Sequence, residues 1–106
     1  MQNIPMLCII VRNDMKDTII NDLYDRLSKI LKNDQKYSYA TIGELISGCI
    51  ENVEHINSYY DQYPPLVDIL ELGAAIEYAS IEYRQESLQQ IRYKMLELKK
   101  LLPDIS

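Results

Sequence analysis

Apolar residues recur three or four positions apart in four stretches of this 106-residue chain, and this spacing constrains the fold more than any other feature. In the first stretch they stand at Ile19, Leu23, Leu27 and Ile30, with Ile20 and Leu31 beside them. Such spacing places side chains along one face of an α-helix. We therefore predict an all-α fold, a compact antiparallel bundle of four main helices in a single domain over residues 1–106.

Polar residues and possible caps predict where the first two helices begin and end. Asn13 or Asp14 can cap the first helix, which should stop near Asn33-Asp34. Thr41 and Glu44 have the capping-box spacing at the start of the second helix. We expect that helix to present one apolar face, formed by Ile42, Leu45, Cys49, Val53, Ile56 and Tyr60. Two glycines, Gly43 and Gly48, lie within the second helix and are expected to serve close packing.

The Tyr63-Pro64-Pro65 junction separates the second helix from the third. Proline is favoured at the first position of a helix, so the third helix should begin at Pro65 and run to about Tyr83. It is apolar almost all round, which predicts a central place in the bundle. We expect a turn over 84–87, because one helix over 65–102 would be about 57 Å long. The last helix carries a heptad-like series that ends before Pro103, at Leu88, Ile91, Met95, Leu98 and Leu102.

The N-terminal run from Ile4 to Val11 is apolar but short. We favour a short extra helix from Pro5, with an extended segment as the alternative. The run is too short to span a bilayer and lacks the flanks of a signal peptide, which predicts a cytoplasmic protein. Cys8 and Cys49 lie among apolar residues, and we expect both to be reduced core thiols.

Catalytic and metal-binding patterns find little support. The single histidine, His55, is expected on the surface with Glu44 and Glu51; a general base or metal ligand is the alternative. One histidine and two distant cysteines do not form a zinc site. We therefore expect no enzyme activity, no cofactor and no metal. Asp68 and Glu71 could form a carboxylate pair, but a solvated face is the simpler interpretation.

Glu77 is the exception, because it projects toward the apolar side of the third helix. A buried carboxylate needs a partner. We expect an ion pair with Arg84 or Arg92, and the alternative is a functional carboxylate in a small helical enzyme.

Charge is distributed unevenly along the chain. Residues 37–83 contain eight carboxylates and no lysine or arginine, and they hold seven of the nine tyrosines. The net charge of −5 argues against direct binding to nucleic acid or to an anionic membrane. A basic protein partner fits this field, and tyrosine is common in binding hot spots. The alternative is an ordinary solvated surface.

If the second and third helices pack antiparallel, the acidic and tyrosine side chains of this block would share one outer face. The predicted partner-binding residues are Glu44, Glu51, Glu54, Tyr59, Tyr60, Asp61, Tyr63, Asp68, Glu71, Tyr78 and Glu82.

In its whole architecture the chain resembles the small acidic all-helical immunity proteins of bacterial toxin systems. The resemblance runs from the capped first helix through the Lys36-Tyr37-Ser38 linker and the Tyr63-Pro64-Pro65 junction to the last helix, Leu88 to Leu102. The nearest types are the helical partners of contact-dependent growth-inhibition toxins and of tRNA-cutting colicins; bacteriocin immunity bundles are more distant. The resemblance implies a cytoplasmic inhibitor of a basic toxin domain, often a ribonuclease.

An alternative function is a helical adaptor or a homodimer without an inhibitory role. Its contact surface would be the Ile9-Ile10-Val11 run or the leucine-rich last helix.

Overall fold

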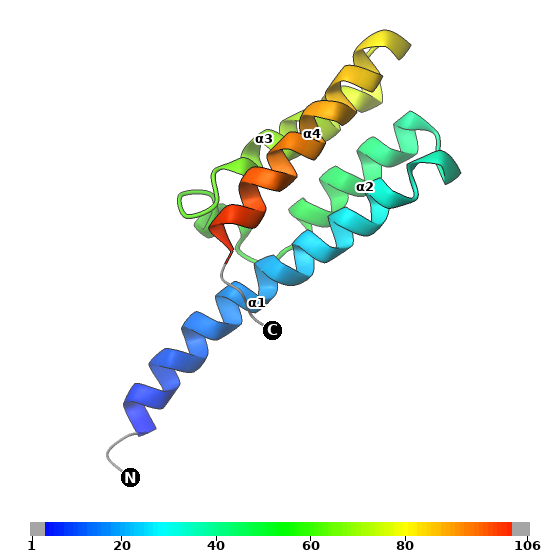
Figure 1. Ribbon diagram of the computed structural model, residues 1–106. Helices are drawn as coiled ribbons and strands as arrows, with labels where there is room; N and C mark the ends of the chain where they lie inside the picture. Colours follow the sequence, from blue (N-terminus) through cyan, green and yellow to red (C-terminus); the bar gives the residue numbers. More distant parts are fainter. Residues whose placement is uncertain (1–3, 103–106) are drawn as a thin grey trace.

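The computed structural model describes the backbone of residues 4–102 and the side chains of residues 18–102. The elements are α1 (Ile4–Lys32), η1 (Asp34–Lys36), α2 (Tyr39–Glu51), η2 (Ile56–Tyr59), α3 (Pro65–Tyr78) and α4 (Ile81–Leu101). No strand occurs over 4–102. The predicted all-α class and the four packed main helices are confirmed (Figure 1).

Helix α3 lies between α2 and α4 and packs closely against both, as its nearly all-round apolar sequence predicts. Helix α1 contacts α2 and α4 through its C-terminal half, and its N-terminal half extends beyond the other helices (Figure 1). Because α1 is continuous from Ile4, the helix start expected near Asn13 or Asp14 is wrong. No break separates the N-terminal run from α1; the side chain of Cys8 lies outside the described residues.

The core consists of aliphatic side chains from all four helices and two tyrosines from the α2–α3 connection. On α1 it buries Ile20, Leu23, Leu27 and Leu31. Ile20 and Leu31, predicted beside the apolar face, are thus more buried than Ile19 and Ile30, which only pack against the core. On α4 the predicted residues Leu88, Ile91, Met95 and Leu98 are all buried, and Leu102 packs against the core. Pro103, which was predicted to end the last helix, lies outside the described residues.

Helix α2 begins earlier than expected, at Tyr39, and Ser38 is its N-cap. The Ser38 hydroxyl accepts a hydrogen bond from the Thr41 amide at 3.2 Å, so Thr41 is inside the first turn and the Thr41–Glu44 capping box is wrong. The packing of the bundle buries the face formed by Ile42, Ile46 and Ile50. Two residues of the predicted face are less buried than expected: Leu45 is exposed and Cys49 is half-buried.

The end of α2 also differs from the prediction. The helix stops at Glu51, and Ile56 and Tyr60 belong to the connection that follows rather than to the helix face. His55 has a left-handed backbone, with φ 60°, and precedes η2. A left-handed residue interrupts right-handed helical geometry, so η2 begins as a new element after His55.

Helices α2 and α3 approach most closely at two glycines. A Cβ atom on Gly43 would lie 2.6 Å from the Gly73 carbonyl oxygen, and one on Gly73 would lie 2.9 Å from Ile46 Cγ2. Gly43 lies next to Glu77, and Ile46, further along α2, lies next to Gly73, which comes earlier in α3. The two helices are therefore antiparallel. The packing role expected for Gly43 is confirmed, whereas Gly48 faces open space.

Helix α3 begins at Pro65, as predicted, but the break before α4 falls at Ala79-Ser80 instead of 84–87. Ala79 is extended, with ψ 160°, and Ser80 occupies the N-cap position of α4. The Ser80 carbonyl already accepts a bond from the Arg84 amide at 2.9 Å. Residues 81–83 therefore form the first turn of α4 rather than the end of α3, which moves their side chains onto a different helix.

Candidate protein-binding surface

Glu44 and Glu51 on α2 are seven positions apart, and both are exposed. Seven residues are close to two helical turns, so the two carboxylates share one side of α2. That side is opposite to Ile42, Ile46 and Ile50, which face the core. Burial of the three isoleucines in the core therefore places the two carboxylates on the solvent side of α2.

Glu71 and Tyr78 on α3 repeat this seven-residue spacing, and both are exposed, Tyr78 to 86%. They lie opposite to the buried positions Ile69, Gly73 and Ile76. Because α2 and α3 pack antiparallel and bury their other faces against the rest of the bundle, these two pairs lie on the same outer side. We call Glu44, Glu51, Glu71 and Tyr78 the α2–α3 wall.

The turn between α3 and α4 continues the wall with exposed apolar groups. Ile81 and Tyr83 are exposed beside the predicted residue Glu82. Ile81 and Tyr83 are not among the predicted binding residues, and the sequence placed both at the end of the third helix. Their exposure follows from the early break at Ala79-Ser80, which only the packing reveals.

Arg84, the first basic residue after this turn, folds back toward α3. Its Nη2 atom donates to the Glu77 carbonyl oxygen at 3.5 Å, and its Nε atom is shielded from solvent. A guanidinium at the C-terminus of a helix interacts favourably with the free carbonyls there. The positive charge thus points toward the end of α3 and leaves Glu82 on the exposed side of the turn.

Two predicted binding residues, Tyr59 and Tyr63, are in the core, and Tyr63 is only 1% exposed. Their surface position in the prediction is corrected by this burial. The chain has no phenylalanine or tryptophan, so tyrosine supplies the only large aromatic rings for the core. Tyr60 is half-buried, and burial, with a smaller contribution from Glu51, raises its pKa. Tyr60 therefore borders the wall rather than projecting from it.

The remaining predicted carboxylates differ in their solvent exposure and in their ion pairs. Glu54 and Asp61 are exposed, and Glu54 lies 3.6 Å from His55, which is exposed as expected. Asp68 lies at the α4 side of α3, where its carboxylate is 3.4 Å from Lys94 Nζ. Lys94 also contacts Glu97 at 2.9 Å, and its hydrogen bond to Glu97 is the largest cause of its raised pKa. Asp68 is therefore partly neutralised, and Glu71 is not paired with it as a catalytic carboxylate.

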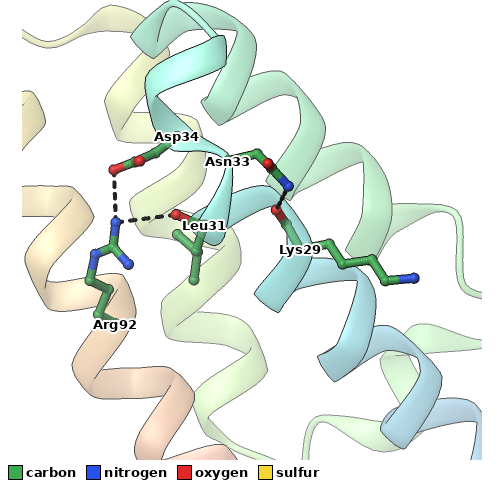
Figure 2. Close-up of polar contacts among 5 residues, drawn as sticks. All are labelled: Lys29, Leu31, Asn33, Asp34 and Arg92. Atoms are coloured by element: carbon green, nitrogen blue, oxygen red, sulfur yellow. Dashed lines mark hydrogen bonds and ion pairs between the residues drawn. The ribbon is translucent and has the colours of Figure 1, made fainter.

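The expected ion pair between Glu77 and Arg84 or Arg92 is wrong. Arg84 reaches only the backbone oxygen of Glu77, and Arg92 binds Asp34 at 2.8 Å and the Leu31 carbonyl at 3.3 Å (Figure 2). Glu77 is half-buried beside Gly43, so its carboxylate can remain hydrated without a cationic partner.

A cleft of about 270 Å³ with a mixed polar and apolar lining lies between α1 and the end of α2. Arg26 and Cys49 both line it, and burial raises the pKa of the Cys49 thiol while Arg26 opposes that rise. Over the residues described, no three histidine, cysteine or carboxylate side chains come together in a way that could hold a metal ion. Within the same residues, none of the helices combines the length and the hydropathy needed to cross a membrane.

Comparisons with known protein families, with characterised proteins and with solved structures find no match to this chain.

Proposed function

We propose that this protein is an immunity protein, an inhibitor that binds a basic toxin domain through the α2–α3 wall and the adjoining α3–α4 turn. Ribonuclease is the toxin class that we favour, since its cleft must be positive to bind a phosphate backbone. A negative surface can occupy such a cleft and exclude the substrate. The observation that most supports this proposal is the wall itself, in which three exposed carboxylates and Tyr78 share one side of two antiparallel helices.

The surroundings of the wall support this proposal. The segment that forms it contains no lysine or arginine, and Arg84 is turned toward the end of α3. Lys94 partly neutralises Asp68 at the edge of the wall, but no ion pair involves Glu44, Glu51 or Glu71 among the described side chains. An uncompensated field of this kind can raise association rates toward about 10⁸–10⁹ M⁻¹s⁻¹.

The exposed apolar side chains at the α3–α4 turn supply contact area that could contribute to binding affinity. Carboxylates steer a partner, but aromatic side chains buried at the centre of an interface contribute most of the affinity. Tyr78, Ile81 and Tyr83 are exposed next to Glu82. In this proposal the wall attracts the toxin, and the turn gives it an apolar contact.

The test measures binding of the purified toxin domain encoded beside this chain, by surface plasmon resonance at several salt concentrations. Glu51→Lys, Glu71→Lys and Glu82→Lys should each slow association by about tenfold and flatten its salt dependence. Asp25→Lys, a matched reversal of an exposed carboxylate on α1, should change association far less. Equal effects at all four positions, or no binding by the wild-type protein, would refute the proposal.

A further inference from the structure

The outward face of α4 combines exposed apolar side chains with a charge at each end. Tyr93 is 64% and Leu96 59% exposed, and Tyr83 and Leu101 are exposed near the two ends of the helix. These residues lie opposite to the buried series from Leu88 to Leu98. Large apolar side chains grouped on one outer helix face are a common mark of a protein interface.

The charges on this face have a symmetry of their own. Glu86 precedes Tyr93 by seven positions and Lys100 follows it by seven, and all three side chains are exposed. The three residues therefore fall on one line along α4, with the carboxylate and the ammonium group about 21 Å apart. In the described structure neither Glu86 nor Lys100 forms an ion pair.

We propose that this face binds a second copy of the chain, with the two α4 helices antiparallel and the two Tyr93 rings at the twofold axis. In that arrangement Glu86 of each protomer faces Lys100 of its partner, so the twofold axis creates two ion pairs and each charge is compensated once. Tyr83 and Leu101 lie ten positions before and eight positions after Tyr93, so they meet at both ends of the contact. A twofold interface of this kind uses the same patch on both copies.

The charge pattern selects this orientation over the parallel one. Parallel α4 helices in register would place Glu86 against Glu86 and Lys100 against Lys100, and like charges in contact disfavour such pairing. The surface is separate from the α2–α3 wall, because α4 buries its other side against α3. The dimer contact centred on Tyr93 therefore leaves the wall free, but Tyr83 at the start of α4 belongs to both proposed surfaces. Variants on the wall and variants in the middle of α4 test the two proposals separately.

The experiment is sedimentation equilibrium over a concentration series, with helix content checked by circular dichroism. The wild-type protein should dimerise, and Glu86→Lys or Lys100→Glu should each weaken the dimer by about tenfold or more. The double variant Glu86→Lys/Lys100→Glu should restore it, because the opposite charges again face each other. Leu96→Glu should abolish the dimer, and Glu71→Lys on α3 should leave it unchanged.

A wild-type protein that remains monomeric up to millimolar concentration would overturn the proposal. So would a dimer that the α4 variants do not weaken, or one that the double variant does not restore. Loss of toxin binding by Glu71→Lys with the dimer intact would show that the two surfaces are distinct.

Discussion

Arg92 on α4 and Asp34 at the α1–α2 corner are joined by a hydrogen-bonded ion pair, with 2.8 Å between Nη2 and Oδ2 (Figure 2). The same Nη2 atom lies 3.3 Å from the Leu31 carbonyl oxygen at the C-terminal end of α1. One guanidinium thus holds the carboxylate of the corner and a free carbonyl of the preceding helix. The contact connects the last helix to the first across 58 positions of sequence.

We expect Arg92→Ala and Asp34→Ala each to lower the free energy of unfolding by about 1 kcal/mol, because both side chains are partly exposed and solvent screens the pair. The double variant should show a coupling energy of roughly 0.5 kcal/mol that decreases with salt. Urea denaturation measures both quantities. Gln85→Ala, an exposed change on the same helix, is the control. Strict additivity of the two changes would contradict the ion pair.

The glycines of α2 and α3 give a prediction with opposite signs. Gly43→Ala should destabilise the protein by about 2 kcal/mol, because the new methyl would meet the Gly73 backbone oxygen, which cannot move away easily. Gly73→Ala should cost less, since it meets the Ile46 side chain. Gly48→Ala faces open space and should stabilise the protein by about 0.5–1 kcal/mol. Thermal unfolding of the three variants checks the order, and equal effects would exclude the close helix crossing.

The cap of α2 distinguishes the observed helix start from the predicted one. Ser38→Ala should cost about 1 kcal/mol, because the Thr41 amide loses its acceptor. Ser38→Asp should retain most of the stability. Thr41→Ala should have a smaller effect than Ser38→Ala, since the Thr41 hydroxyl bonds to the Ser38 hydroxyl, at 2.9 Å, and caps no backbone amide. The reverse order in denaturant titrations would favour a helix that begins at Thr41.

The Cys49 thiol should react slowly with iodoacetamide at neutral pH. Burial raises its pKa above that of an ordinary thiol, so the reactive thiolate forms only at higher pH. Arg26 opposes this rise, and Arg26→Gln should therefore move the pH–rate profile of alkylation further upward. The Cys8→Ser background isolates Cys49, and Lys36→Gln is the control for a charge change elsewhere. A profile that moves downward in Arg26→Gln would contradict this assignment.

The wall was partly predictable from the sequence. Helical spacing and the absence of basic residues placed Glu44, Glu51 and Glu71 on exposed helix faces, and exposure there follows from local pattern. Tyr59 and Tyr63 were assigned to the same surface but are buried, because composition cannot tell a core ring from a surface ring when tyrosine is the only aromatic residue. Ile81 and Tyr83 were missed, since their exposure depends on where α3 ends.

The sequence by itself determined the elements that rest on local physics. Apolar spacing gave four helices, Pro65 gave the start of α3, and the Leu88–Leu98 series gave the buried face of α4. These follow from backbone geometry and from the burial of one helix face, both of which act within a few residues. The register of α2 was harder, because Ser38 and Thr41 are both acceptable caps and only packing chooses between them.

Tertiary structure decided the rest, because those features depend on groups far apart in the chain. The Gly43–Gly73 crossing, the Arg92–Asp34 pair and the burial of Tyr63 all join different elements. Glu77 is closer to Arg92 in the sequence than Asp34 is. The packing of α4 against the α1–α2 corner nevertheless brings Arg92 to Asp34. The chemistry of a side chain determines which groups it can bind. The three-dimensional arrangement of the helices decides which of those groups lies within reach.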